Sequence, residues 1–183
     1  MSAPEPQPTP QIPQEPSIWL WGAMFVSLIA LAGSLYLSLG MGLKACPLCL
    51  YQRTFVMGVV GVLAVGFFVK ELQPRALSLL ALPLAVGALA VVAWHEYLEQ
   101  TGKLECPRGV LGVGTAPQQS LAILALLVAL LVIDQLRHQR LMGVLATFVL
   151  GGLLAFSAIK SAIPPIPNYD LTVDEDMCRK PKN

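Results

Sequence analysis

The chain has 183 residues, of which 55% are hydrophobic and only 13% are charged, and its mean hydropathy is +0.66. Soluble domains carry roughly 25% charged residues, so this composition excludes an ordinary soluble protein and indicates a membrane protein. The net charge of +1 provides no basic surface that would favour a nucleic-acid partner.

The first 17 residues differ in composition from the rest of the chain. They contain six prolines and neither Lys nor Arg, so the basic region that begins a signal peptide is missing. Pro-rich polar sequence is typical of disordered, extended segments. We therefore expect residues 1–17 to form a disordered cytoplasmic tail.

Five long apolar runs follow this tail. A membrane-spanning helix needs about 20 mostly apolar residues, and the second run reaches that length only if it begins near Cys46 and includes Arg53. The sequence predicts an all-α, polytopic membrane helix bundle over residues 18–163, with a fifth helix added to a core of four. The expected spans are 18–41, 47–69, 76–97, 118–136 and 141–162, and residues 164–183 form a tail that carries Cys178.

The number of spans decides where the four cysteines lie. Five spans place Cys46, Cys49, Cys106 and Cys178 on one face of the membrane, whereas four would leave Cys178 opposite the others. The short loops on the other face each carry two basic residues, which weakly favours a cytoplasmic location. Stable disulfides belong to oxidising compartments such as the periplasm, so we expect the cysteine face to be periplasmic.

The segment Cys46-Pro47-Leu48-Cys49 begins the second predicted span. Proline suits the first turn of a helix, which places the cysteines at a helix N-terminus, where partial positive charge stabilises the reactive thiolate. Arg53 follows Cys49 by four residues and shares its helical face, with Gln52 beside it, and both are candidate cofactor-binding residues. A guanidinium within a span costs about 2.5–3.5 kcal/mol on insertion scales, so a functional partner such as a quinone carbonyl is expected.

Simpler interpretations of these residues remain open. The two cysteines could be half of a zinc site, although the sequence has no second Cys-x-x-Cys. They could also form a purely structural disulfide. Arg53 could extend to the membrane interface without binding anything. The proline-containing pair followed by Gln-Arg favours redox chemistry, and no metal site is predicted.

The stretch Cys-Pro-Leu-Cys-Leu-Tyr-Gln-Arg, Cys46 to Arg53, resembles the DsbB family of disulfide-generating membrane proteins, and the resemblance covers roughly residues 18–110. It implies a DsbB-like core of four helices in the bacterial inner membrane. It also implies that Cys46 and Cys49 form a quinone-linked disulfide, that Cys49 adjoins the quinone (ubiquinone or menaquinone) and that Arg53 contacts it. The implied activity is disulfide generation, by reoxidation of a periplasmic thioredoxin-like dithiol oxidase resembling DsbA.

The same family has a second disulfide outside the membrane, which exchanges with that partner. Cys106 matches the first member of this pair, because it follows the third span. The second member normally lies in the same loop, but that loop has no other cysteine here. Pairing of Cys106 with Cys178 is therefore inferred from the five-span topology and the absence of another candidate. Two unpaired thiols are the alternative.

Some further residues have two possible roles each. His95 ends the third span and could relay a proton to reduced quinone, or it could be an interfacial residue beside Trp94 and Tyr97. Asp134 could lie on a proton path or simply at the inner interface. Five glycines are expected to permit close helix packing: Gly58, Gly61, Gly66, Gly151 and Gly152.

Two other functions are compatible with these features. A vitamin K epoxide reductase-like enzyme also couples a Cys-x-x-Cys pair to a quinone beside a second pair. A non-enzymatic membrane scaffold or small transporter with structural disulfides is the second alternative, and it predicts no response to quinone.

Overall fold

The structure is a computed structural model that describes residues 16–69, 73–137, 141–162 and Cys178. Its described part is all-helical apart from turns and an isolated bridge between Arg108 and Thr115. The helices are α1 (Ile18–Leu39), α2 (Pro47–Phe68), α3 (Pro74–Gln100), α4 (Ala116–Arg137) and α5 (Leu141–Ser161). All five are long and apolar enough to cross a membrane. The predicted polytopic helical bundle is therefore confirmed.

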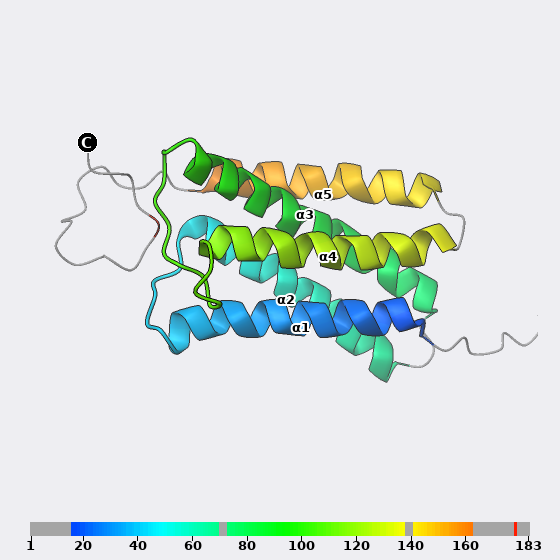
Figure 1. Cartoon of the computed structure of the whole chain (residues 1–183). Coiled ribbons are helices and arrows are strands. Elements are labelled where there is room, and N and C mark those ends of the chain that lie inside the picture. Colours follow the sequence, from blue (N-terminus) through cyan, green and yellow to red (C-terminus); the bar gives the residue numbers. More distant parts are fainter. Residues whose placement is uncertain (1–15, 70–72, 138–140, 163–177, 179–183) are drawn as a thin grey trace, which may run out of the picture.

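The helices lie side by side and are shown in Figure 1. The α1–α2 and α3–α4 connections and Cys178 lie at one end of the bundle, which we call the cysteine end. Residues 1–15 of the expected N-terminal tail and nearly all of the expected C-terminal tail fall outside the described residues, whereas Ser17 belongs to the start of α1.

The observed helix bounds differ from the predicted spans mainly in α3. This helix begins at Pro74, which is favourable at the first helical position, and it continues to Gln100 rather than stopping at residue 97. The apolar run ends near Trp94, but the polar residues after it include good helix formers such as Glu and Gln. The extra turn therefore extends the helix towards the cysteine end.

Helix α3 is the centre of the bundle. In its most apolar 18-residue stretch 61% is buried, compared with 22–33% for the corresponding stretches of the other helices. It contacts α2, α4 and α5. The buried face of α2 repeats every three or four residues, at Leu48, Gln52, Val56, Val59, Leu63 and Gly66, as expected for an amphipathic helical face. Much of the outer surface of α5 is exposed and apolar, which suits contact with lipid.

Three of the five glycines expected at helix contacts are confirmed in that role. A Cβ at Gly66 would clash with the Leu77 side chain, one at Gly58 would come within 3.0 Å of Leu84, and one at Gly151 would lie 2.7 Å from the carbonyl oxygen of Pro83. The prediction is wrong for Gly61 and Gly152, where a Cβ would meet nothing within 4 Å. Those two lie on outward faces of α2 and α5, where close packing is not needed.

The end opposite the cysteines is closed by polar contacts between α1 and α4. Ser17 caps α1 by accepting a hydrogen bond from the N–H of Leu20 at 3.3 Å, and its hydroxyl donates to the carboxylate of Asp134. Asp134 is only 2% exposed. Asp134 therefore lies in a packed contact between α1 and α4.

Candidate functional site

Cys46 and Cys49 lie at the N-terminus of α2. Cys46 is the N-cap residue, its backbone is extended, and Pro47 occupies the first turn. The Cys46 Sγ accepts a hydrogen bond from the backbone N–H of Cys49 at 3.3 Å. The two Sγ atoms are 2.7 Å apart and both thiols are free, so a small side-chain rotation brings them to the disulfide length of about 2.05 Å. The predicted helix-mouth placement of this pair is confirmed.

The surroundings of Cys46 favour its thiolate. The hydrogen bond with the Cys49 thiol has the largest effect and lowers the pKa of Cys46, while burial opposes it by raising the pKa. The hydrogen bond and charge of His95 and the backbone N–H of Cys49 lower it further, so that the pKa falls from 9.0 to about 5. Cys46 is therefore a thiolate at neutral pH when reduced, which is the form that attacks disulfides.

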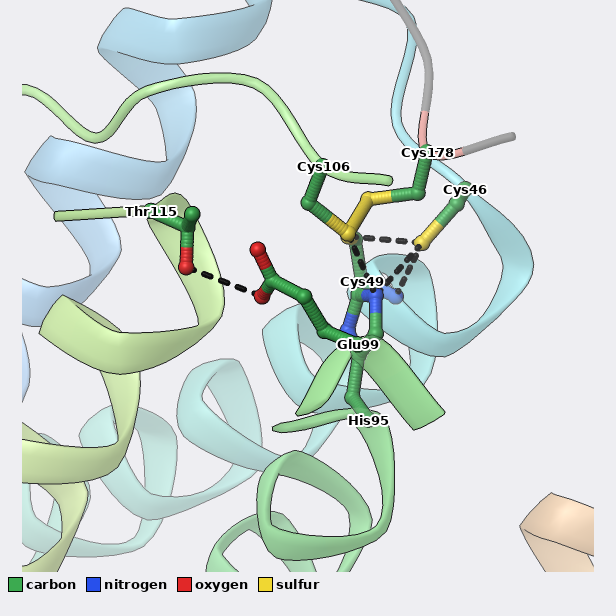
Figure 2. The surroundings of a disulfide bond; sticks show 7 residues. All are labelled: Cys46, Cys49, His95, Glu99, Cys106, Thr115 and Cys178. Atoms are coloured by element: carbon green, nitrogen blue, oxygen red, sulfur yellow. Dashed lines mark hydrogen bonds between the residues drawn. A yellow bond between two sulfur atoms is a disulfide. The ribbon is translucent and has the colours of Figure 1, made fainter. Parts of the chain in front are cut away.

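The second pair, Cys106 and Cys178, is joined in a disulfide across 72 positions of sequence. This is the pairing expected from the topology. Cys106 belongs to the α3–α4 connection, which is held near α3 by a 2.9 Å hydrogen bond from the Thr115 hydroxyl to the Glu99 carboxylate (Figure 2). Cys178 packs in a small cluster with Cys46 and Ala155 of α5. The two pairs are thus adjacent.

The distances between the pairs are short enough for direct exchange after small movements. The Sγ atoms of Cys46, Cys49 and Cys178 and a ring nitrogen of His95 all lie within 4.8 Å of one another. Thiol–disulfide exchange requires a thiolate to reach a disulfide sulfur. Because Cys178 is the member of the second pair in this group, it is the sulfur best placed to react with the first pair.

His95 lies between the two pairs and is completely buried. Its Nε2 is 3.3 Å from the Cys106 Sγ and 3.9 Å from the Cys46 Sγ, and Figure 2 shows the ring pointing from α3 towards the sulfurs. Trp94 and Tyr97, in contrast, are exposed and stacked on each other. The aromatic neighbours therefore fit an interfacial belt, whereas His95 does not.

A buried carboxylate beside His95 was not predicted from the sequence. Glu96 is 5% exposed, and its Oε1 accepts hydrogen bonds from the side-chain amides of Gln100 at 2.8 Å and Gln118 at 3.3 Å. Its Oε2 has no partner among the described residues. The predicted third span, 76–97, already included Glu96, but the rotation of α3 that turns this side chain into the bundle is not encoded by a local sequence signal.

Arg53 links α2 to α1 and also lines a hollow between the helices. Its guanidinium donates to the Ser34 hydroxyl at 3.0 Å, the Ser34 carbonyl oxygen at 2.8 Å and the Ser38 hydroxyl at 2.6 Å. Arg53 therefore does not simply extend to the interface, because it holds the last turns of α1. Sequence reasoning missed both serines, since nothing in their spacing pairs them with an arginine on another helix.

Apolar and polar residues both line the hollow. It is lined by Ala30, Leu31, Ser34, Gln52, Arg53, Val56, Ser120, Ile123 and Leu124. Gln52 is 8% exposed, and its Nε2 has no partner among the described residues. A small set of polar groups in an apolar cleft is typical of a ligand site. His95 is not among the lining residues, so the three predicted cofactor-binding residues separate into Gln52 and Arg53 here and His95 at the sulfurs.

Comparison with known proteins agrees with this geometry. A family model described as "Disulfide bond formation protein DsbB" matches residues 16–118, more than half of the chain. The chain belongs to the DsbB family. The matched region contains Cys46, Cys49, His95 and Cys106, whereas Cys178 and α5 lie beyond it.

Two DsbB relatives each match about half of the chain. A protein named "Disulfide bond formation protein B" from Methylococcus capsulatus is 32% identical over 98 residues, which are 52% of this chain and 59% of that protein. A protein of the same name from Herminiimonas arsenicoxydans is 29% identical over 87 residues, 48% of this chain and 55% of that protein. The chain thus spans somewhat over half the length of each relative. No solved structure gives a significant match.

Proposed function

We propose that this chain is a membrane thiol:quinone oxidoreductase that generates disulfides for protein folding. The observation that carries the proposal is the meeting of both cysteine pairs at one end of the bundle, with Cys178 within 4.8 Å of Cys46 and Cys49. Membership of the DsbB family supports disulfide formation as the overall activity. A purely structural role would not require a free Cys-x-x-Cys pair, with Cys46 buried, beside a second disulfide.

Electrons enter at the Cys106–Cys178 disulfide. A thiolate of the partner attacks the Cys106 Sγ, forms a mixed disulfide and releases the Cys178 thiolate. The second thiolate of the partner then attacks its own sulfur in the mixed disulfide, which leaves the partner oxidised and Cys106 reduced. Attack at Cys106 is favoured because the other sulfur, that of Cys178, lies within 4.8 Å of the first pair.

The electrons then move to the first pair by two exchanges. The Cys178 thiolate attacks Cys46 in the Cys46–Cys49 disulfide, forming a Cys46–Cys178 bond and releasing the Cys49 thiolate. Cys106 next attacks Cys178, which restores the Cys106–Cys178 disulfide and leaves Cys46 and Cys49 reduced. This last state has the same pairing as the structure, with one closed disulfide and two free thiols.

The residues around the hollow fit a quinone. Its apolar side chains, Leu31, Ile123 and Leu124 among them, suit contact with a ring, and the unpartnered Gln52 amide and the Arg53 guanidinium are hydrogen-bond donors for carbonyl oxygens. A quinone bound there would supply an acceptor for two electrons and two protons. Within the chain, His95 is the group placed to exchange protons with the thiols, because its Nε2 lies 3.9 Å from the Cys46 Sγ.

The expected surroundings follow from the same chemistry. We propose that the protein lies in the bacterial inner membrane with the cysteine end in the periplasm, where disulfides persist. The partner is a periplasmic thioredoxin-like dithiol oxidase of the DsbA type. The second electron acceptor is the membrane quinone pool, ubiquinone or menaquinone.

Quinone reduction by the purified protein tests the proposal. With a reduced thioredoxin-like partner and a soluble ubiquinone analogue, the wild-type protein should reduce quinone and the Cys49→Ala variant should not. Thr54→Ala, on an exposed part of the same helix, is the matched control and should keep wild-type turnover. Undiminished turnover of Cys49→Ala, or no turnover of the wild-type protein as a structural scaffold predicts, would contradict the proposal.

A further inference from the structure

The sulfur cluster at the cysteine end has the composition of a metal site as well as a redox site. Three cysteine Sγ atoms, from Cys46, Cys49 and Cys178, and one nitrogen of His95 lie within 4.8 Å of one another. Three thiolates and one imidazole form a ligand set that binds zinc tetrahedrally in proteins. Cys106 is outside this set, although it is bonded to Cys178.

The separations are close to those that a zinc ion requires. With Zn–S of about 2.3 Å and Zn–N of about 2.0–2.1 Å, tetrahedral ligands lie about 3.5–3.8 Å apart. The Cys46 Sγ and His95 Nε2 are already 3.9 Å apart, while the Cys46 and Cys49 sulfurs, at 2.7 Å, must separate by about 1 Å. Rotation about the side-chain torsions of these two cysteines provides such a movement without a change in the backbone.

The state of His95 is a second and independent observation. The imidazole is fully buried, its Nε2 faces the sulfurs, and its Nδ1 has no hydrogen-bond partner among the described residues. A neutral imidazole with its proton on Nδ1 presents the Nε2 lone pair to the centre of the cluster. A metal ion at that position would therefore find a nitrogen ligand already aimed at it.

We propose that the fully reduced protein binds one Zn²⁺ ion through Cys46, Cys49, His95 and Cys178. The site depends on redox state, because a sulfur in a disulfide is not a thiolate ligand. With Cys106–Cys178 closed, only three ligands are available, and when Cys46–Cys49 is also oxidised the site is lost. Zinc in the four-ligand site would hold the thiols reduced and prevent their exchange.

Cobalt binding to the detergent-solubilised protein tests this proposal directly. Co²⁺ replaces zinc in tetrahedral thiolate sites and gives thiolate-to-metal charge-transfer absorption and tetrahedral d–d bands. After reduction with a phosphine and purification through a tag without histidine, the wild-type protein should take up one Co²⁺, and Zn²⁺ should displace it. The protein with both disulfides formed should show no tetrahedral cobalt spectrum.

Two matched variants identify the fourth ligand. Both Cys106→Ser and Cys178→Ser lack the Cys106–Cys178 disulfide and keep three cysteines, but only Cys106→Ser retains all four proposed ligands. We expect the reduced Cys106→Ser protein to bind Co²⁺ as tightly as the reduced wild-type protein and Cys178→Ser to bind at least about tenfold more weakly. His95→Gln should weaken binding similarly.

The outcomes separate this proposal from the thiol oxidase proposal. Equal Co²⁺ affinity of the two serine variants, or a cobalt spectrum without tetrahedral bands in the reduced wild-type protein, would overturn the metal site. Neither result bears on quinone reduction, which is measured without added metal. Circular dichroism of both variants controls for loss of the helical fold.

Discussion

The Sγ of Cys178 lies within 4.8 Å of the Sγ of Cys46, although four of the five helices separate the two residues in sequence. From this proximity we expect a disulfide between them when their usual partners are removed. The double variant Cys49→Ala/Cys106→Ser should form a Cys46–Cys178 bond on mild oxidation. Non-reducing peptide mapping by mass spectrometry would identify it.

The matched double variant for this test is Cys49→Ala/Cys178→Ser, which leaves Cys46 and Cys106. Since Cys106 is not part of the mutually close group formed by Cys46, Cys49, His95 and Cys178, we expect its disulfide to form at least about tenfold more slowly, a difference of about 1.4 kcal/mol in barrier height. Equal rates in the two variants would show that both cysteines reach Cys46 and would remove the basis for assigning separate roles to them.

The reactivity of Cys46 should depend on pH in an unusual range. Because its pKa is lowered from 9.0 to about 5, the thiolate persists as the pH falls through neutrality and is protonated only near pH 5. The alkylation rate of Cys46 in the reduced protein, followed by mass spectrometry, should therefore stay constant above about pH 6 and fall below it.

The Cys49→Ala variant is the control for the cause of this behaviour. The hydrogen bond from Cys49 is the largest effect that lowers the pKa of Cys46, so its loss should move the fall in alkylation rate to higher pH. An unchanged pH profile in Cys49→Ala would show that Cys49 does not stabilise the Cys46 thiolate.

Arg53 has a structural role and a proposed ligand-binding role, and two variants separate them. Arg53→Met removes three hydrogen bonds to α1, and bonds to charged groups contribute about 1.5–3 kcal/mol each. It should lower thermal stability in detergent and raise the KM for quinone at least about tenfold, a loss of about 1.4 kcal/mol of binding.

Ser38→Ala provides the comparison, since it removes one of these hydrogen bonds and leaves the guanidinium in place. We expect a smaller loss of thermal stability and a KM for quinone within about twofold of the wild-type value, or about 0.4 kcal/mol. If Arg53→Met loses stability but keeps the wild-type KM, Arg53 serves only to join α1 and α2.

We expect alanine substitutions at two neighbouring glycines of α5 to have different effects on stability. A Cβ at Gly151 would lie 2.7 Å from the Pro83 carbonyl oxygen and from the Val86 Cβ, whereas one at Gly152 would meet nothing within 4 Å. Gly151→Ala should therefore cost about 1–3 kcal/mol of stability through overpacking, and Gly152→Ala should not destabilise. Thermal unfolding of both variants in the same detergent measures this difference, and equal destabilisation would contradict the close α3–α5 contact.

Much of the fold could be predicted because its signals are local. Apolar runs of span length set the helices, and Pro47 and Pro74 mark the starts of α2 and α3. The Cys-Pro-Leu-Cys motif at a helix start could be recognised for the same reason, since N-cap geometry depends on only a few consecutive residues. The presence of all four cysteines at one end followed from the number of helices.

Other features depend on rotations of whole helices, which the sequence does not contain. Gly151 packs against α3 and Gly152 does not, because α5 is rotated so that Gly151 faces α3. The rotations of α2 and α3 likewise bring Arg53 to Ser34 and Ser38 and bury Glu96. Most residues of α2 and α5 are apolar or small and are compatible with either a lipid-facing or a protein-facing position, so these contacts required the packed structure.

The disulfide between Cys106 and Cys178 joins residues separated by α4 and α5. During synthesis, Cys106 therefore emerges well before its partner exists, at a time when Cys46 and Cys49 are already present. For that interval the nascent chain has three thiols and can close a bond between Cys106 and the helix-mouth pair. Correct assembly must then wait for, or be corrected after, insertion of the last helix. The maturation of this protein is consequently tied to completion of its chain.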